Sequence, residues 1–589
     1  MRIIVYSETN AATVGGNLGL AEYSYYFVLK KYLPVLERLG EVVHVEDPQL
    51  EVDALFEQAA ITGEPSVFLS FTPPNRTVRG LKCPTVCVLA WEFDNIPNES
   101  WDIEDPWQNW VLAIQEIGYV LTISDYATRI IRHQVGSRPR VETVPAPVDS
   151  RVVAGGNGQD PLATKAGGPG HRTLALAASI YDTEALDIDF ESVTARAPSA
   201  DGSGTSVLLW DGHAADWDFF STSETPGPYL VGFYVEESWG SWSKTARPSV
   251  NFPWSIVGEV ELAIELVGYG ANQGRTVSAN VGSQVIDIVL PAALEVIRLN
   301  LTLDMPVDNI YFTGLITAPE EGAREHRTLG LGLRSMSLRR SGAGDSSTEV
   351  PRLRDNDARK SATTLDLSGT VYASVFNPAD GRKNWFDIVT AFCWAFKERA
   401  DKTLILKMSH HNRSTFLGDL FLLFSSLAPF KCRVIAIHGY LSDDELAALV
   451  AVTDFFVTAS TAEGQCLPLL EFMAEGVPAI SPKHTAMETY INSDNAFVVS
   501  SSHEPHIWPN DPRKCYRTLS NRIDWDSLRQ AYCDSASVLL DEPKRYALMS
   551  AASRSVVEKH YSSQEVEKRL RKFLRKTARP RRWWHVGGM

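Results

Sequence analysis

The sequence predicts two doubly wound α/β domains with an all-β domain inserted between them. In residues 1–153 and 369–562, short apolar runs alternate with helical stretches, as expected for parallel sheets covered on both faces. Residues 174–340 are instead rich in Val, Ile, Thr, Trp and Tyr, with closely spaced turn signals and almost no helical periodicity. A chain of 589 residues is also too long for a single core, so several domains are expected.

The first α/β domain is predicted from apolar runs that suit buried strands: RIIVYSE, EVVHVED, SVFLSFT, TVCVLAWEF and YVLTISD. Between the first two runs, AEYSYYFVLKKYLPVLERLG predicts a helix, with Gly40 just beyond its end.

Linkers are predicted on both sides of the all-β region, at 154–173, which is rich in Gly and Pro, and at 341–368. Inside the region, alternation in VELAIELV is typical of a strand, and we predict a β-sandwich or jelly roll. The region also contains tryptophans whose rings can either stack on sugar or fill the sandwich core. They are Trp210, Trp217, Trp239, Trp242 and Trp254.

In the second α/β domain, strands are predicted at GTVYASVFN, KTLILKM, VIAIHGYLS, DFFVTAS and VPAISP, and helices at NWFDIVTAFCWAFKER and PLLEFMAEG. SDDELAALVAVT predicts another helix, because Ser442 and Glu445 have the spacing of a capping box.

Charge and cysteine content exclude some classes of function. The formal net charge of −16 argues against a general nucleic-acid-binding protein. The 7 cysteines are scattered without paired C-x-x-C motifs, so we expect free thiols and no structural zinc. The N-terminus has no signal-peptide pattern and no stretch of about 18 apolar residues occurs, so a cytoplasmic location is expected.

The stretch TASTAEGQCLPLLEFMAEG predicts a strand, a loop and a helix, with Pro468 in the first helical turn. Ligands of open α/β sheets bind at the carboxyl ends of the strands, where a helix start favours an anion such as a diphosphate. Gly464 would let the backbone approach that group, with Glu463 in the cleft and Glu471 accepting hydrogen bonds from ribose hydroxyls. The alternative is that Glu463 only caps the helix and Glu471 is solvated.

This stretch resembles the E-x7-E signature of retaining GT-B glycosyltransferases of family 4. The matching residues are Glu463, Gly464, Leu467, Pro468, Glu471, Gly476 and Pro478. The resemblance implies two Rossmann-like domains facing a cleft, with Glu463 near the donor sugar and Glu471 on the nucleotide ribose. It also places Gln465, Cys466 and Leu467 in the donor-binding loop.

A second stretch, SVFNPADGRKNWFDIVTAF, resembles the same family. Lys383 lies eight residues before the Ala391-Phe392 pair, as does the family lysine that neutralises the donor diphosphate. The family arginine would fall at Pro378, so Arg382 is expected to supply that charge. A solvated pair at a helix start is the alternative for both cations. Lys407, at the end of a predicted strand, is a further donor-binding candidate or a plain surface lysine.

The N-terminal domain supplies the remaining candidates. Gly15 and Gly16, in a loop after the first strand, resemble the Gly-rich loop that lies over the cleft in these enzymes. Strand ends in AWEFDNIP and TISDYA resemble stretches of bacterial polysaccharide enzymes, and their polar residues could face the acceptor. These residues are Glu92, Asp94, Ser124 and Asp125, and Glu488 is expected to flank the cleft.

The C-terminal segment 563–589 is strongly basic and contains Trp583 and Trp584. Four apolar residues recur in it at helical spacing: Val566, Leu570, Phe573 and Leu574. One interpretation is an interfacial helix on anionic lipid, giving peripheral membrane contact through 566–584. The other is a helix that crosses back onto the N-terminal domain, and both can hold together.

The resemblance implies a retaining glycosyltransferase that moves a hexose from a nucleotide-diphosphate sugar to a growing glycan, lipid-linked or part of a lipopolysaccharide. It implies no cofactor and no obligatory metal, because Lys383, Arg382 and the helix start would neutralise the diphosphate. A non-catalytic, lectin-like protein on the same scaffold is the alternative. A glycan phosphorylase ranks lower, because the sequence has no evident signature of a lysine-bound pyridoxal phosphate.

Overall fold

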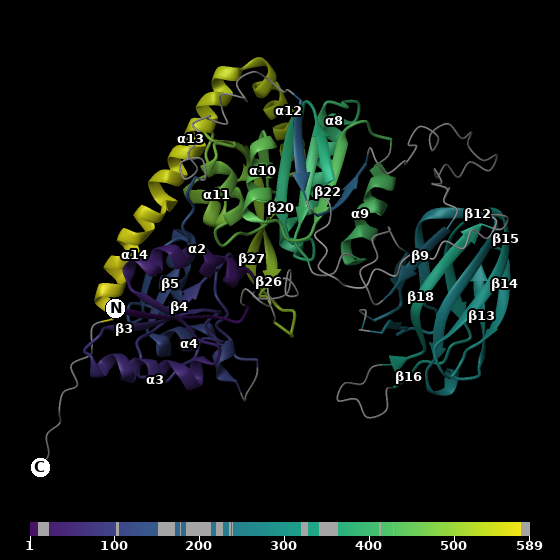
Figure 1. The fold of residues 1–589 in the computed structure, drawn as a ribbon, viewed down its shortest axis with the longest axis horizontal. Helices are drawn as coiled ribbons and strands as arrows, with labels where there is room; N and C mark the ends of the chain where they lie inside the picture. Colours follow the sequence, from purple (N-terminus) through teal and green to yellow (C-terminus); the bar gives the residue numbers. More distant parts are fainter. Residues whose placement is uncertain are drawn as a thin grey trace, which may run out of the picture. The chain divides into compact units, whose positions relative to one another are not determined.

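The computed structural model describes most of the chain, which divides into two compact units (Figure 1). The first comprises Met1–Leu186, Lys360–His411 and Lys431–Met589, and the second Asp187–Arg359 and Asn412–Phe430. The described residues are 1–9, 23–101, 105–150, 171–176, 178–183, 214–219, 228–234, 237, 239–319, 328–340, 363–410, 414–427, 429–509 and 511–578.

The N-terminal domain of the first unit is a six-stranded parallel sheet in the order β2-β1-β3-β4-β5-β6. Its strands are β1 (Arg2–Ser7), β2 (Glu41–His44), β3 (Ser66–Phe71), β4 (Thr85–Leu89), β5 (Tyr119–Thr122) and β6 (Arg140–Thr143). Its helices are α2 (Tyr23–Leu39), α3 (Pro48–Ile61), α4 (Trp110–Ile117) and α5 (Asp125–Val135), with a short 3-10 turn η1 (Pro106–Gln108). The five apolar runs of the sequence all form strands here. Gly40 follows α2 directly, where a Cβ would lie 2.0 Å from the Met1 carbonyl oxygen, so only glycine fits.

The C-terminal domain has a seven-stranded sheet in the order β25-β24-β23-β20-β21-β22-β8. Its parallel strands are β20 (Thr370–Phe376), β21 (Lys402–Met408), β22 (Arg433–His438), β23 (Phe455–Val457), β24 (Ala479–Pro482) and β25 (Ala496–Val499). Its helical elements include η3 (Gly381–Lys383), α8 (Trp385–Phe396), α10 (Asp443–Val452), α11 (Leu467–Ala474), η4 (Thr485–Thr489) and α12 (Trp525–Asp541). The predicted capping box of α10 is confirmed, since Ser442 and Glu445 cap each other reciprocally.

The order of this sheet reverses at β20. Strands β21 and β22 lie on one side of β20, whereas β23, β24 and β25 lie on the other. Loops that leave the carboxyl ends of two neighbouring strands on opposite sides of such a reversal diverge and leave a crevice between them. The loops after β20 and β23 carry Lys383 and Glu463.

The predicted start of the inserted domain at 174 is wrong. Strand β7 (Arg172–Leu176) pairs with β19 (Thr363–Leu367), and β8 (Ser179–Asp182) adds antiparallel to β22. Both predicted linkers therefore overlap strands, and the second unit begins only at Asp187. The guanidinium of Arg172 anchors β7 by two hydrogen bonds to the Asp454 carboxylate, at 2.8 and 2.9 Å. Such pairing is long-range, so the local sequence of these short strands does not reveal it.

The second unit is antiparallel over its described strands. One sheet runs in the order β11-β18-β12-β15-β13-β14, with β9 on β18 and β10 on β12. The strands are β9 (Ala214–Asp218), β10 (Tyr229–Val231), β11 (Ser241–Trp242), β12 (Ser249–Gly268), β13 (Thr276–Val281), β14 (Gln284–Val289), β15 (Glu295–Thr313) and β18 (Leu331–Arg340). Helix α9 (Ser414–Leu427), which the sequence assigns to the C-terminal domain, belongs to this unit instead.

The tryptophans of the second unit have different environments. Trp217 is 2% exposed and belongs to the core, whereas Trp239 and Trp242 are half-buried and pack on each other with ring centroids 4.8 Å apart. Trp210 and the Trp254 side chain lie outside the described residues.

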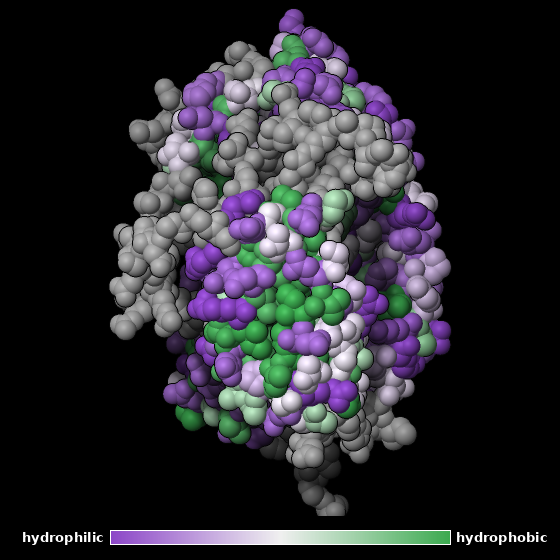
Figure 2. All heavy atoms as spheres, turned by 90° about the vertical axis from the view of Figure 1, so that its right-hand side faces the viewer, coloured by the Kyte–Doolittle hydropathy of each residue, from purple (hydrophilic) through white to green (hydrophobic). Residues whose placement is uncertain are grey.

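Hydrophobic residues also gather on a surface that is otherwise of mixed polarity, as Figure 2 shows. In this unit the exposed large apolar side chains are Val285, Val289, Val296, Met305 and Ile316. Sugar binding by this unit stays a prediction.

Two C-terminal helices connect the α/β domains of the first unit. Helix α13 (Pro543–Tyr561) lies on the C-terminal domain and α14 (Ser563–Thr577) on the N-terminal one (Figure 1). The apolar residues at helical spacing, Val566, Leu570, Phe573 and Leu574, are fully buried in the N-terminal core. That stripe therefore packs on protein and is not a lipid-facing surface, while Trp583 and Trp584 lie outside the described residues. No described helix is both long and apolar enough to cross a membrane.

Replacing Phe573 with alanine tests how much α14 contributes to the N-terminal core. Phe573 is fully buried there, so Phe573→Ala should lower the free energy of unfolding by about 3–5 kcal/mol, measured by urea denaturation. The neighbouring exposed residue offers a control, and Lys572→Ala should change that free energy by no more than about 0.5 kcal/mol. Equal effects of the two substitutions would contradict the packing of α14 as described.

Candidate active site

The loop between β23 and α11 holds Glu463 in a fixed position. The Glu463 N–H donates to Thr485 Oγ1 at 3.0 Å, and its carbonyl accepts from the Ala486 N–H at 3.2 Å, so η4 supports the loop. Cys466, directly before α11, adopts a left-handed conformation with φ 60°, which turns the chain into the helix. The Glu463 side chain is only 7% exposed. A buried carboxylate of this kind requires a partner.

Lys383 is that partner. It ends the short turn η3, and its Nζ lies 2.6 Å from Glu463 Oε1. The Thr461 N–H donates to the Arg382 carbonyl at 2.8 Å, so the loops after β20 and β23 are also joined through their backbones. The structure thus brings together Glu463 and Lys383, which the resemblance places at the donor sugar and at its diphosphate, although they are separated by 80 positions.

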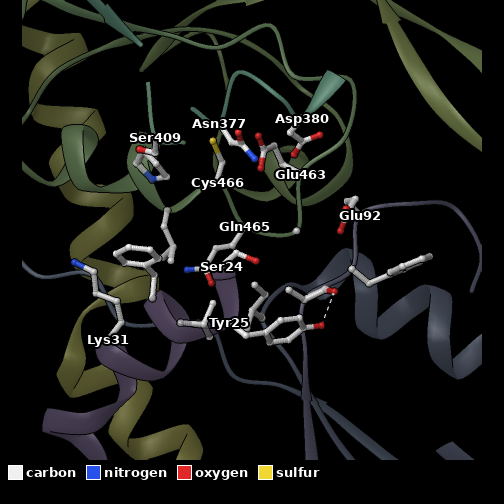
Figure 3. A pocket seen from close by; sticks show the side chains of 18 of the residues that line it. Ser24, Tyr25, Lys31, Glu92, Asn377, Asp380, Ser409, Glu463, Gln465 and Cys466 are labelled. Atoms are coloured by element: carbon white, nitrogen blue, oxygen red, sulfur yellow. Dashed lines mark hydrogen bonds between the residues drawn. The ribbon is translucent and has the colours of Figure 1, made fainter. Parts of the chain in front are cut away.

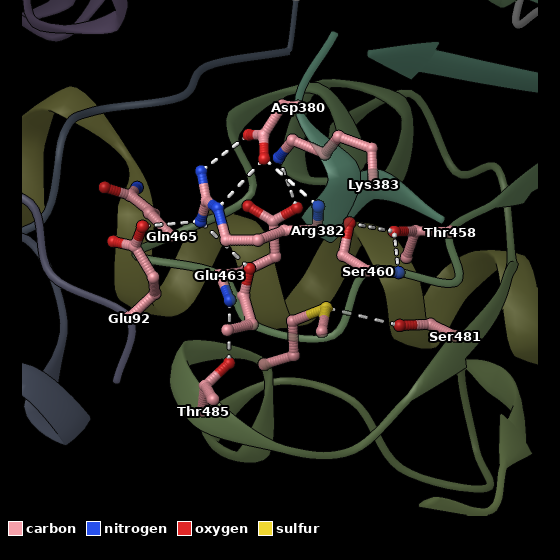
Figure 4. A network of polar contacts seen from close by, with 12 residues as sticks. Glu92, Asp380, Arg382, Lys383, Thr458, Ser460, Glu463, Gln465, Ser481 and Thr485 are labelled. Atoms are coloured by element: carbon pink, nitrogen blue, oxygen red, sulfur yellow. Dashed lines mark hydrogen bonds and ion pairs between the residues drawn. The ribbon is translucent and has the colours of Figure 1, made fainter. Parts of the chain in front are cut away.

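Arg382 joins the two α/β domains. Its Nη1 lies 2.6 Å from Glu92 Oε1, which follows β4 of the N-terminal domain, and also donates to the Ala462 carbonyl at 3.2 Å. Its Nε and Nη2 donate to both carboxylate oxygens of Asp380, at 3.1 and 2.7 Å. Figure 4 shows Arg382 among the three carboxylates Glu92, Asp380 and Glu463.

The two carboxylates that face these cations differ in their ionisation. Burial opposes ionisation of Glu463, yet Lys383 and Arg382 hold the pKa of its carboxyl below the ordinary value. For Glu92, burial outweighs the attraction of Arg382 and raises its pKa. Burial disfavours the charge of Lys383, but Glu463 raises its pKa, so the lysine is charged. Glu463 is therefore an anion, whereas Glu92 takes up a proton more readily.

These side chains line a cavity of about 1420 Å³. The cavity runs between the two α/β domains, and Figure 3 shows Glu463 and Asp380 on the C-terminal side and Ser24, Tyr25 and Lys31 of α2 on the other. Glu471, on α11, also lines it and forms an ion pair with Lys31. The second glutamate of the motif thus contacts the N-terminal domain, as Glu92 contacts the C-terminal one.

Lys407 is a buried cation in the same cavity. It lies near the end of β21, is 6% exposed, and its Nζ donates to Ser409 Oγ. Burial lowers its pKa to about 8. No ion pair is formed by Lys407 within the described ranges, in contrast to Arg382 and Lys383, so it is available to an anion.

The other residues of the predicted donor loop have mixed roles. Cys466 and Leu467 line the cavity, as does Gly464, where a Cβ would lie 3.4 Å from the Trp91 backbone nitrogen. Gln465 also lines it, but its side-chain amide bonds both the N–H and the carbonyl of Ala146, at 2.9 and 2.8 Å. The Gln465 amide therefore fastens the loop to the N-terminal domain.

Of the acceptor-side candidates, only Glu92 lines the cavity. Asp94 accepts hydrogen bonds from Thr518 Oγ1 at 2.7 Å and from the Leu519 N–H at 2.9 Å. Ser124 caps α5, whose first residue is Asp125, and Glu488 pairs with Arg129 at 2.8 Å. The local sequence did not indicate these hydrogen bonds, this helix cap or this ion pair. Gly15 and Gly16 lie outside the described residues.

Two site residues were missed from the sequence. Asp380 orients Arg382, and its position two residues before that arginine in ADGRK is the signal that could have indicated it. Lys31 reaches Glu471 from another domain, and no local pattern marks it. Among the described residues, no group of three or more His, Cys, Asp or Glu is arranged to hold a metal ion.

Comparison with protein families gives two matches. Residues 424–508, which include Glu463 and Glu471, match the family model described as glycosyl transferases group 1. Residues 221–340 match a domain of unknown function, DUF7024. No curated protein matches the chain. Residues 424–508 are therefore similar to glycosyl transferases group 1, which supports a role in glycosyl transfer.

Solved structures give distant similarities. A pneumococcal O-GlcNAc transferase in complex with UDP and GlcNAc is 20% identical, over 35% of each chain, with a TM-score of 0.27. Anabaena HepE in complex with UDP-glucose is 15% identical, over 35% of this chain and 49% of that one, with a TM-score of 0.27. A glycosyltransferase from Rickettsia africae is 9% identical, over 98% of this chain and 99% of that one, with a TM-score of 0.43. The chain spans less than half of the pneumococcal and Anabaena structures.

The lowered pKa of Lys407 predicts a pH-dependent affinity for a diphosphate. A bound diphosphate favours the charged amine and raises its pKa above the free value of about 8, so binding takes up a proton and weakens as the pH rises through 8. Calorimetric titration with inorganic pyrophosphate should show an affinity loss between pH 7 and 9 that is on the order of tenfold larger in the wild type than in Lys407→Met.

The ligand's own ionisation contributes equally to both proteins, so only the difference between them reports Lys407. The same pH dependence in both would contradict a role for Lys407 in binding the anion.

Proposed function

We propose that this chain is a retaining glycosyltransferase of the GT-B type. It transfers a hexose from a nucleotide-diphosphate sugar to a growing glycan that is lipid-linked or part of a lipopolysaccharide. The observation that carries the proposal is the Lys383–Glu463 pair. It lies at the crevice of the C-terminal sheet, next to the start of α11, and faces the cavity, and its Glu463 belongs to the region that matches a glycosyltransferase model.

The charges around the pair support a diphosphate as ligand. Three carboxylates, Glu92, Asp380 and Glu463, face the cations Arg382 and Lys383, and Lys407 adds a third positive charge to the same cavity. The unpaired N–H groups and dipole at the start of α11 favour an anion at the same place. In the proposed complex, phosphate oxygens replace Glu92 and Glu463 as partners of Arg382 and Lys383.

The proposed mechanism follows from this exchange of partners. Lys383, Arg382 and the start of α11 stabilise the charge that develops on the leaving diphosphate. Glu463, released from Lys383, accepts a hydrogen bond from the donor sugar, while Glu471 holds the ribose. The acceptor hydroxyl attacks from the face that the diphosphate leaves, and a phosphate oxygen takes its proton. No separate base and no obligatory metal are required in this scheme.

Substitution of the two motif glutamates separates donor binding from chemistry. Glu471→Ala should weaken donor binding about tenfold, the loss expected for hydrogen bonds to a charged group. Glu463→Ala should leave the donor bound but lower turnover about 10²–10³-fold. The measurements are thermal shift with UDP, GDP, ADP and dTDP sugars, followed by release of the nucleotide that shifts the protein.

Lys383→Ala should abolish the thermal shift caused by the nucleotide sugar. Glu558→Ala, at an exposed position, should change neither this thermal shift nor the rate of nucleotide release. If no nucleotide sugar stabilises the wild type, or if all three site variants keep full activity, the proposed function is wrong. The first of these outcomes would favour the lectin-like alternative.

Neutralising Glu92 tests the competition for Arg382. In Glu92→Gln the amide releases Arg382 more readily, while Asp380 still orients the guanidinium. The nucleoside diphosphate that shifts the wild type should therefore bind roughly three- to tenfold more tightly, about 0.7–1.4 kcal/mol, in calorimetric titration. Weaker binding in this variant would show that Glu92 supports the site instead of competing for its cation.

A further inference from the structure

A β-hairpin of the C-terminal domain reaches onto the N-terminal domain. It is formed by β26 (Ser501–Ile507) and β27 (Tyr516–Ile523), which lie between β25 and α12. Thr518 and Leu519 of β27 donate to Asp94, as described above, and the β27 carbonyl of Arg517 accepts from Asn95 Nδ2 at 2.7 Å. The hairpin therefore engages the segment that follows β4.

The tip of the hairpin extends this contact. Glu99 Oε2 accepts from Arg513 Nη1 at 2.7 Å and Glu99 Oε1 from Arg517 Nε at 2.8 Å. Trp508, 2% exposed, donates from Nε1 to Asn95 Oδ1 at 2.7 Å and packs in a core cluster with N-terminal residues. Polar and apolar contacts together fix the segment from Trp91 to Trp101.

The fixed segment and the hairpin tip form part of the cavity wall. Trp101, Pro97, Pro509 and Pro512 all line the cavity. Trp101 is half-buried, and the Arg513 guanidinium lies over its ring, 5.1 Å from the centroid. Trp91 and Trp110 line it too but are only 3% and 9% exposed, so they serve mainly as core. Of the described tryptophans that line the cavity, Trp101 is thus the one that is not buried, although Arg513 covers part of its ring.

Unused hydrogen-bonding groups lie in the same wall. Gln108 donates from Nε2 to Asp105 Oδ2 at 2.7 Å, and its Oε1 accepts no hydrogen bond from the residues that the structure describes. Neither the Trp101 indole N–H nor the Asn75 side-chain amide has a partner within the described part of the chain, and both residues line the cavity. One donor, one acceptor and one amide that offers both therefore line the same cavity as an aromatic ring.

We propose that this end of the cavity binds a pyranose unit of the acceptor glycan, with Trp101 against the C–H face of the sugar and Gln108 and Asn75 on its hydroxyls. A pyranose combines an apolar face with a ring of hydroxyls, and an aromatic ring with a few neutral polar groups is the matching surface. The inference rests on the proposed function in naming the sugar as acceptor. It adds a subsite built from both α/β domains through the hairpin.

Saturation-transfer difference NMR with maltose, cellobiose, lactose and α-1,6-mannobiose tests the subsite without any donor. At least one disaccharide should receive saturation at its ring C–H protons from the wild type. Trp101→Ala should lower its affinity at least tenfold, as expected for loss of a stacking ring. Trp394→Ala is the matched control, because Trp394 is 66% exposed and outside the cavity lining, and should bind as the wild type does.

Gln108→Leu removes the free acceptor without removing the ring, and should weaken the same sugar several-fold. It keeps the test decisive if Trp101→Ala fails to fold. The inference is overturned if no disaccharide receives saturation, or if neither Trp101→Ala nor Gln108→Leu weakens binding.

A thermal shift with nucleotide sugars on the same proteins separates the two proposals. Thermal stabilisation by a nucleotide sugar without binding of any disaccharide would contradict only the proposed subsite. Disaccharide binding that depends on Trp101, without thermal stabilisation by any nucleotide sugar, would support the subsite and contradict the proposed glycosyltransferase function.

Discussion

The ion pair between Lys383 and Glu463 is the interaction on which the rest of the site depends. A carboxylate that is 7% exposed is costly unless a cation meets it, and Lys383 can do so only because β20 and β23 are neighbours in the sheet. That adjacency follows from the reversal of strand order at β20. The support of the Glu463 loop by η4 and the left-handed turn at Cys466 then hold the loop in the geometry that the pair requires.

The same charged groups also join the two α/β domains. Arg382 binds Glu92 across the cavity, and Glu471 binds Lys31, so groups expected to hold a donor are engaged in contacts between domains. Under the proposed function, Arg382 exchanges Glu92 for a phosphate oxygen, and Glu471 exchanges Lys31 for a hydroxyl that donates to its carboxylate. The Gln465 amide, by contrast, accepts one hydrogen bond from the Ala146 backbone and donates another to it, and so serves as a fixed connection. Gln465 thus only connects the domains, whereas Arg382 and Glu471 connect them and, under the proposed function, also bind the donor.

The local sequence was sufficient to predict those features that depend on the pattern of neighbouring residues. The apolar runs of both α/β domains became strands, and the spacing of Glu463 and Glu471 placed both in the cavity lining. It was insufficient where distant segments decide. Strands β7 and β8 resemble the inserted domain in composition, yet pairing with β19 and β22 assigns them to the C-terminal domain. The sequence predicts that Asp94 faces the acceptor. In the structure its carboxylate instead accepts a hydrogen bond from Thr518 of the hairpin, some 420 positions away.

Glu92 shows why the two carboxylates beside Arg382 are not equivalent. Glu463 has Lys383 as its ion-pair partner, and the two nearby cations hold the pKa of its carboxyl below the ordinary value. Glu92 has Arg382 as its ion-pair partner among the described residues, and burial already raises its pKa. Under the proposed function, a donor phosphate that attracts Arg382 leaves Glu92 to take a proton or to accept a hydrogen bond from an acceptor hydroxyl. Occupation of the donor site would then prepare the acceptor side, and Arg382 would connect the two through one short ion pair.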